Sequence, residues 1–277
     1  MGRKTNRRLF TDFIREYVEE VRPLRSRATI QVYLSLVRDL DSYDKNLYLD
    51  KINVSILNNF IKAQAQTWEI NTLNKKAKHL KAFLNRAYER QLVRHDQYIS
   101  FKVPSYVQKL PTYISEEEMQ SFKEVCDSIK QPMMKMSGYY FLLSCYAGYR
   151  ISDLKRFRYD ESVKNNKIII TAKKNRQIVS IPIHSRLKEV LTYCKDNPLT
   201  IAEQNLRDHV KAIAKMAGIT KDLRVHDGRH SFAMMLMDRG FDTEEVAELL
   251  GITSKVAKVY ARISNKRLEQ KVIHKLG

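Results

Sequence analysis

The sequence predicts a mostly α-helical protein of two domains that carries one small antiparallel β-sheet. Apolar residues recur at helical spacing over most of the 277 residues, and strand-like patterns are confined to two neighbouring segments. The helical periodicity lapses around Pro104 and Pro111. We therefore expect an interdomain linker there, with a first domain over residues 1–104 and a second over residues 105–277.

The first two helices follow from apolar spacing and from the residues that begin and end helices. Apolar side chains recur at helical spacing from Leu9 to Val18, and this helix is expected to end near Pro23. Ser26 has the side chain of an N-cap residue and precedes the second helix. That helix carries on one face Ile30, Tyr33, Leu34 and Val37.

Two further helices complete the first domain, over residues 54–66 and 71–90. The fourth helix is expected to turn inward the side chains of Leu73, Ala77, Leu80, Leu84, Ala87 and Tyr88. Its other faces carry Lys75, Lys76, Lys78, Lys81 and Arg86. Such a basic flank is either a solvated helix face or a surface that binds nucleic acid, and the sequence leaves both readings open.

The second domain begins with a helix that follows the capping-box pattern Ser115-Glu-Glu-Glu118. A longer apolar helix is expected over residues 132–147. The one clear strand pair comes next, over residues 167–171 and 177–183, joined by the turn 172–176. Further helices are expected over residues 185–194, 200–216, 226–239, 243–250 and 266–275, with Asp242 and Glu245 capping the helix at 243.

Composition favours a polyanionic partner and a reducing compartment. The 50 Lys and Arg residues against 31 Asp and Glu give a net charge of +19, which attracts nucleic acid. Cys126, Cys145 and Cys194 are scattered and lack the spacing of a zinc site or a disulfide framework. No apolar segment follows the basic N-terminus, and the most apolar stretch, residues 139–148, is too short to span a bilayer. We therefore expect a soluble, cytoplasmic protein without a membrane segment.

Basic and nucleophilic residues in the second domain have the chemistry that metal-free attack on a phosphodiester requires. Arg150 and Arg229 can hold phosphate oxygens in a bidentate fork, an imidazole can move a proton, and Tyr260 can act as the nucleophile. His226, Arg229 and His230 stand at i, i+3 and i+4, on one face of a helix. An i, i+4 histidine pair can also bind metal, but no nearby Glu or Cys completes a ligand set.

Each of these residues also has an ordinary structural interpretation. The histidine and arginine cluster can be a polar helix start without a role, and Arg150 can simply pair with Asp153. Lysines such as Lys173 and Lys174 are common in hairpin turns, where water solvates them. Tyr260 is one of 15 tyrosines, most of which belong to the core or the surface by default. Only the set in its order along the chain favours a catalytic reading.

In this order the motifs resemble those of the tyrosine recombinase (phage integrase) family. Its first box reads Gly-x-Arg-x-x-Glu/Asp-Leu, which Gly148-Tyr-Arg150-Ile-Ser-Asp153-Leu154 fits. Its last box, Leu-Gly-His followed by a spacer and Tyr-Ala, resembles Leu250-Gly251 with Tyr260-Ala261. The resemblance covers nearly the whole chain. It implies an N-terminal helical core-binding (SAM-like) domain followed by a tyrosine-recombinase catalytic domain.

The resemblance also implies a role for each site residue. Tyr260 would attack the phosphate and form a 3′-phosphotyrosyl link, and Arg150 and Arg229 would neutralise the developing charge. His226 would accept or donate a proton, and His230 would support the phosphate. Lys174 would be the general acid, with Lys173 as the alternative, and Asp153 would be a structural support. The family uses no metal, nucleotide or other cofactor.

Assembly on double-stranded DNA follows from the same resemblance. Four protomers would join two DNA sites and exchange strands through a Holliday junction, and an accessory directionality factor can be required. The last helix of the family docks on a neighbouring protomer, so Leu268, Val272 and Ile273 are either oligomer contacts or part of an ordinary terminal helix. The outcome stays open between integration, excision, inversion and dimer resolution.

One departure from the family pattern concerns the phosphate. The family has His or Trp directly after Leu-Gly, whereas this chain has Ile252, which cannot donate a hydrogen bond. Thr253, Ser254 or Lys255 could supply the missing donor. Two alternatives to the recombinase therefore stay open. One is a DNA-binding regulator that has lost catalysis, and the other is a nicking-closing enzyme similar to type IB topoisomerases.

Overall fold

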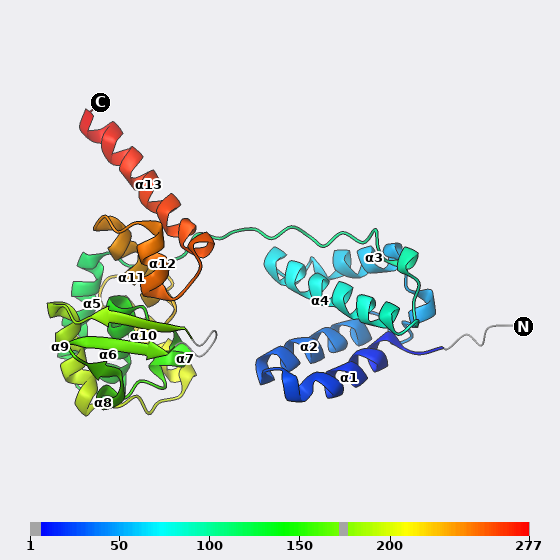
Figure 1. Ribbon diagram of the computed structural model, residues 1–277, viewed down its shortest axis with the longest axis horizontal. Coiled ribbons are helices and arrows are strands. Elements are labelled where there is room, and N and C mark those ends of the chain that lie inside the picture. Colours follow the sequence, from blue (N-terminus) through cyan, green and yellow to red (C-terminus); the bar gives the residue numbers. More distant parts are fainter. Residues whose placement is uncertain (1–6, 172–176, 277) are drawn as a thin grey trace, which may run out of the picture. The chain divides into compact units, whose positions relative to one another are not determined.

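The computed structural model describes residues 7–171 and 177–276. Contacts within the chain divide it into two compact units, Met1–Lys109 and Leu110–Gly277. The described residues are mostly helical, with one small antiparallel sheet in the second unit (Figure 1). The fold class predicted from the sequence is therefore confirmed.

Unit 1 is a bundle of helices around its own apolar core. Its elements are α1 (Phe10–Val21), α2 (Arg27–Tyr43), α3 (Val54–Gln64) and α4 (Ile70–Glu89), with 3-10 turns at Arg22–Leu24, Leu49–Lys51 and His95–Gln97. The Ser26 hydroxyl accepts a hydrogen bond from the Thr29 amide at 3.2 Å, so Ser26 is the N-cap of α2. The buried aromatic side chains of this core include Phe10, Phe13, Phe60 and Phe83.

The predicted inward face of α4 was wrong at its last position. Tyr88 is 48% exposed and its ring lies 5.2 Å from the His95 ring, whereas Phe83 is buried. Each residue advances about 100° around a helix. Tyr88 therefore lies beyond the edge of the buried stripe that ends at Ala87, and Phe83 lies within that stripe.

The basic flank of α4 is partly occupied by contacts within unit 1. Lys76 pairs with Asp39 and lies 3.9 Å above the centre of the Trp68 ring. Lys81 donates to two backbone carbonyls at 3.1 and 3.2 Å, and Arg86 pairs with a neighbouring glutamate at 2.6 Å. Lys75 and Lys78 are exposed. Three of the five bases thus have structural contacts, which limits how many of them can meet a phosphate.

Unit 2 contains the remaining helices and the sheet. Its helices are α5 (Glu116–Ser128), α6 (Pro132–Ala147), α7 (Ile151–Leu154), α8 (Tyr159–Ser162), α9 (Ser185–Asp196), α10 (Glu203–Met216), α11 (Asp227–Asp238), α12 (Thr243–Leu250) and α13 (Ser254–Leu276). Both capping boxes predicted at Ser115 and Asp242 are present. The sheet has the order β1 (Val163–Lys164), β2 (Lys167–Thr171), β3 (Ile178–Pro182), all antiparallel. The short strand β1 was not predicted, because two residues carry no readable alternation.

Helix α6 is the centre of unit 2, in contact with α5, α9, α10 and α11. Its residues from Ser137 to Ala147 are buried, which explains why the sequence is apolar on every face. The helix ends at Gly148, whose φ of +66° lies in the left-handed region that favours glycine, and the Gly148 amide donates to the Ser144 carbonyl at 2.9 Å. The chain therefore leaves the core abruptly, two residues before Arg150.

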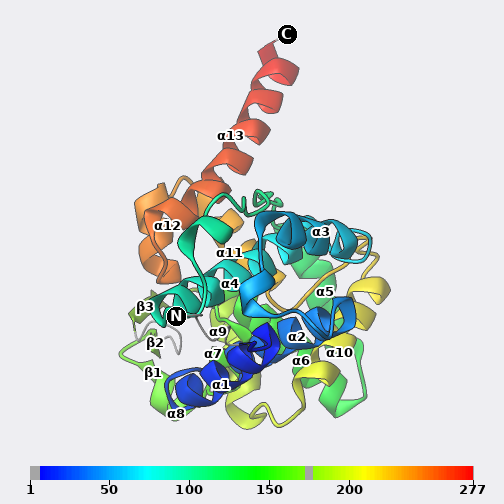
Figure 2. The same ribbon diagram turned by 90° about the vertical axis from the view of Figure 1, so that its right-hand side faces the viewer.

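The terminal helix α13 begins at Ser254, twelve residues earlier than the predicted start at 266. Its inward positions are Ala257, Tyr260 and Ser264, all buried. Lysines, an arginine and serines interrupt the apolar pattern there, so periodicity alone does not reveal the helix. Figures 1 and 2 show α13 continuing past α12 and extending beyond the other helices of unit 2.

No helix among the described residues is long and apolar enough to cross a lipid bilayer.

Candidate active site

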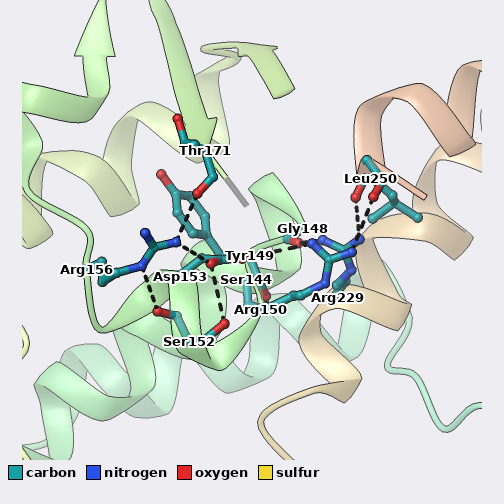
Figure 3. Close-up of polar contacts among 11 residues, drawn as sticks. Ser144, Gly148, Tyr149, Arg150, Ser152, Asp153, Arg156, Thr171, Arg229 and Leu250 are labelled. Carbon is teal, nitrogen blue, oxygen red and sulfur yellow. Dashed lines mark hydrogen bonds and ion pairs between the residues drawn. The ribbon is translucent and has the colours of Figure 1, made fainter. Parts of the chain in front are cut away.

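Arg150 lies on the loop that follows α6, as the N-cap of α7. The Ser144 hydroxyl donates to the Tyr149 carbonyl at 2.7 Å and fixes this loop against α6 (Figure 3). The Arg150 side chain is 18% exposed, and its Nη1 lies 4.0 Å from an Asp153 carboxylate oxygen. Its Nη2 donates to the Gly251 carbonyl at 3.3 Å. These contacts are long, so the guanidinium keeps capacity for a stronger acceptor such as a phosphate.

Asp153 is buried, and of the two arginines that pair with it, Arg156 lies closer than Arg150. Arg156 Nη2 lies 2.8 Å from Asp153 Oδ1 and 2.9 Å from the Thr171 carbonyl at the end of β2 (Figure 3). Arg156 thus ties the loop that carries Arg150 to the sheet. Arg156 was not among the residues predicted from the sequence, although its i, i+3 spacing from Asp153 permits such a pair.

Arg229, in the first turn of α11, is 6% exposed and lies between two helix ends. Its Nη1 donates to the Gly148 carbonyl after α6 at 2.5 Å, and its Nη2 donates to the Leu250 carbonyl, the last of α12 (Figure 3). The C-terminal ends of helices carry partial negative charge, which stabilises the buried guanidinium. Burial, and then the nearby Arg150, lower the pKa of Arg229 to about 10, so it remains a cation at neutral pH.

The two histidines stand at the start of α11, as predicted from their spacing. Their rings meet edge to face at 4.7 Å between centroids. Desolvation lowers the pKa of His226, and Arg229 and Arg150 add to this, although the residue remains exposed and solvent limits the effect. Burial, His226 and Arg229 lower the pKa of the less exposed His230 to about 4. Both rings are therefore neutral near pH 7 and can accept a proton.

Tyr260 lies in the second turn of α13, which packs on α11 and α12. It is 4% exposed, and its hydroxyl oxygen lies 2.8 Å from His230 Nδ1. Burial raises the pKa of Tyr260, and Arg229 and Arg150 oppose this rise. The fold therefore brings together Arg150, Arg229, His226, His230 and Tyr260. In the sequence the first and the last of these residues, Arg150 and Tyr260, are 110 positions apart.

The remaining predicted residues have different outcomes. Lys173 and Lys174 lie outside the described residues. Ile252 is half-buried and packs against the core of unit 2. Within the described part of the chain, no group of three or more His, Cys, Asp or Glu side chains is placed to hold a metal ion.

The site combines two guanidinium groups, two neutral imidazoles and a buried tyrosine hydroxyl. The arginines can bind and neutralise a phosphodiester, an imidazole can accept the phenol proton, and the phenol can attack phosphorus. A mostly helical fold with a small antiparallel sheet and a site of two arginines, histidines and a tyrosine is typical of enzymes that cut and join DNA through a tyrosine.

Each of the two units matches a family model. The model of the phage integrase family matches residues 112–267, and that of the phage integrase SAM-like domain matches residues 9–103. The chain belongs to the phage integrase family. It is thus a site-specific recombinase, an enzyme that cuts and joins DNA.

The curated relatives are named tyrosine recombinases. The XerC protein of Lactobacillus leichmannii is 25% identical over 241 residues, which cover 79% of this chain and 81% of XerC. The XerD protein of Rickettsia bellii is 22% identical over 298 residues, covering 95% of this chain and 98% of XerD. These names do not favour the regulator or the topoisomerase-like alternative.

Solved structures share the fold. The XerH site-specific recombinase, bound to palindromic difH substrate in a post-cleavage complex, matches with a TM-score of 0.74 at 18% identity, covering 95% of this chain and 84% of that one. A lambda integrase tetramer bound to a Holliday junction matches with a TM-score of 0.75 at 13% identity, covering 90% and 79% respectively.

Proposed function

We propose that the protein cleaves duplex DNA with Tyr260 as the nucleophile and rejoins strands through a 3′-phosphotyrosyl intermediate. One observation carries the proposal: the Tyr260 hydroxyl oxygen lies within hydrogen-bond distance of His230 Nδ1, at 2.8 Å, and near the guanidinium groups of Arg150 and Arg229. The tyrosyl phosphodiester conserves the energy of the cleaved bond, so the free 5′-hydroxyl can attack it and reseal without a nucleotide or metal cofactor.

The arginines would act mainly in the transition state. Arg229 is held by two carbonyls before any ligand binds, so its guanidinium needs little reorganisation when charge develops on the phosphate. With the residues that the structure describes, Arg150 makes only long contacts, and it is more exposed than Arg229, which suits a side chain that closes on the phosphate. Lys174, or Lys173 in its place, would protonate the departing 5′ oxygen.

Ile252 gives the phosphate no hydrogen bond, which is the one weakness in this set. Loss of one such donor slows a reaction by about 10- to 1,000-fold. Thr253 follows Ile252 directly, and Ser254 and Lys255 are the first two residues of α13. Their hydroxyl and ammonium groups are the proposed substitutes for the missing donor.

DNA binding would involve both units, with residues 1–104 as the core-binding domain and residues 105–277 as the catalytic domain. The net charge of +19 supports a polyanionic partner. The XerH and lambda integrase neighbours are complexes with DNA substrates. We expect the enzyme to act in the cytoplasm, where its three buried free cysteines stay reduced.

We further propose that four protomers assemble on paired sites, with an accessory factor setting direction. Val272 and Ile273, near the end of α13, are 52% and 72% exposed. A helix end that leaves such side chains in water gains stability when a neighbouring protomer covers them. Leu268, the third predicted contact, has a side chain outside the described set.

A plasmid assay separates the recombinase from both alternatives. Two copies of the DNA that flanks the gene are cloned into one supercoiled plasmid and incubated with wild-type protein or Tyr260→Phe. We expect inverted or excised products with wild type alone. Relaxation of a plasmid without these copies would identify a nicking-closing enzyme, and an unchanged biological activity of Tyr260→Phe would identify a regulator.

A further inference from the structure

His230 and His226 occupy different places relative to the nucleophile. His230 stands one helical turn into α11, with Nδ1 at 2.8 Å from the Tyr260 hydroxyl oxygen. His226 stands at the N-cap of the same helix, and its ring touches the His230 ring edge to face. The residue in hydrogen-bond contact with the phenol is thus His230, for which the family resemblance implied only a supporting role at the phosphate.

We propose that His230 is a catalytic residue, the base that takes the Tyr260 proton as the strand is cleaved. The inference rests on the proposed function and assigns one of its proton transfers. His226 is then left to interact with the phosphate, near Arg229 and Arg150, whose charges both act on it.

Cleavage moves the phenol proton to His230 and exchanges one phosphorus–oxygen bond for another. The Oη–H bond of Tyr260 breaks, and its proton passes to His230 Nδ1. The phenolate oxygen forms a bond to phosphorus, and the bond from phosphorus to the 5′ oxygen breaks. The 5′ oxygen leaves with a proton from the general acid of the proposed function. In resealing, His230 returns its proton to the tyrosine oxygen.

The charges around His230 suit a proton acceptor. Among the described residues, the charged and titratable groups that act on it are His226 and Arg229 on its own helix and Tyr260 on α13. Burial and the two basic neighbours keep the ring neutral at pH 7, so the acceptor form is present before DNA binds. A bound phosphate offsets the charge of Arg229, which makes the imidazole a stronger base once substrate is in place.

A hydrogen bond that only orients Tyr260 is the competing explanation, and His230→Asn separates the two. The asparagine amide can occupy the place of Nδ1 and keep a hydrogen bond to the phenol, but it cannot accept a proton. His230→Ala removes both functions. The matched control is His226→Ala, which leaves the contact between His230 and Tyr260 in place.

The experiment measures cleavage rates on nicked duplexes that trap the covalent adduct, from about pH 6 to 9.5. Each variant is tested on an ordinary phosphodiester and on a duplex with a bridging 5′ sulfur at the scissile phosphate. A thiolate leaves without protonation, so sulfur restores a variant that lacks the general acid and does not restore one that lacks the base. Native gels and thermal unfolding show whether each variant binds DNA and folds.

We expect His230→Asn and His230→Ala to cleave about 10²- to 10⁴-fold more slowly than wild type near pH 7, with both substrates. Their rates should rise about tenfold per pH unit, because without a base the reaction depends on the fraction of ionised tyrosine. Wild type should change far less over this range.

Two results would overturn the assignment. Folded, DNA-binding His230→Asn that cleaves like wild type would show that a hydrogen bond suffices. Rescue of either His230 variant by the bridging sulfur would show that His230 serves the leaving group. If the proposed function itself were wrong, and Tyr260 were not the nucleophile, the result would be distinguishable. Wild type would then form no covalent adduct with DNA, or Tyr260→Phe would still form one.

Discussion

Replacing Gly148 with alanine should destabilise unit 2 and disturb both arginines of the site. Gly148 has φ +66°, and an added Cβ would lie 2.7 Å from Cδ1 of Phe232 and 3.0 Å from Cδ2 of Leu250. Both neighbours are buried and cannot move aside easily. The Gly148 carbonyl also accepts a hydrogen bond from Arg229. A shift of this residue therefore reaches the phosphate-binding groups directly.

The magnitude has two parts. An L-residue in left-handed backbone costs about 1–2 kcal/mol, and overpacking of a close-packed core costs about 1–3 kcal/mol. We expect Gly148→Ala to lower the free energy of unfolding by about 2–5 kcal/mol. Gly218→Ala is the matched control, because Gly218 has φ +72° with nothing within 4 Å of its added Cβ. It should lose only the backbone part, about 1–2 kcal/mol.

Urea unfolding followed by circular dichroism measures the difference, with tryptophan fluorescence alongside. Trp68 is the single tryptophan and lies in unit 1, so its signal reports on the unit that carries neither substitution. Adduct formation with nicked DNA should fall for Gly148→Ala and persist for Gly218→Ala. Equal unfolding energies for the two variants would refute the steric argument and leave only the backbone term.

Three further predictions follow from the site. Arg229→Met leaves two helix-end carbonyls without their donor, and the removal of a buried charge offsets only part of that cost. The free energy of unfolding should therefore fall by about 2 kcal/mol, compared with less than about 1 kcal/mol for Arg150→Met. Equal losses in urea titrations of the two variants would contradict this. The pKa of His230 falls from 6.5 to about 4 on folding, so about 3 kcal/mol of stability present above pH 6.5 should be lost as the pH drops to 4. The variant His230→Asn should show less of this loss in a series of unfolding curves. Ile252→His should speed adduct formation by at least about tenfold if the missing donor limits the rate; an unchanged rate would mean that another group already supplies it.

Apolar spacing and capping residues were sufficient to predict most of the fold. Helix α6 was predicted at its observed bounds because a fully apolar run ends at a glycine, and α12 because Asp242 and Glu245 form a capping box before it and Gly251 follows it. The start of α13 was missed because its buried face is Ala257, Tyr260 and Ser264, which is not an apolar stripe. Apolar periodicity does not reveal a helix whose stability comes from tertiary packing of small and polar side chains and not from an apolar stripe.

The candidate site residues could be proposed from the sequence, but their contacts could not. Order along the chain indicated Arg150, Arg229 and Tyr260. The bond between His230 and Tyr260 joins residues 30 positions apart and depends on how α13 crosses α11. Likewise, the acceptors of Arg229 are backbone carbonyls at helix ends, which no side-chain motif records. Arg156 was overlooked because its partner at Thr171 becomes a neighbour only when the sheet forms.

The most direct test of the account is to identify the residue that becomes attached to DNA. Wild-type protein is incubated with nicked duplexes from the DNA flanking the gene, and the denaturation-resistant adduct is digested and sequenced by mass spectrometry. We expect one nucleotide-modified peptide, with Tyr260 linked to a 3′ phosphate, and no adduct with Tyr260→Phe. Attachment to another residue, to a 5′ phosphate, or an adduct that survives in Tyr260→Phe would contradict it.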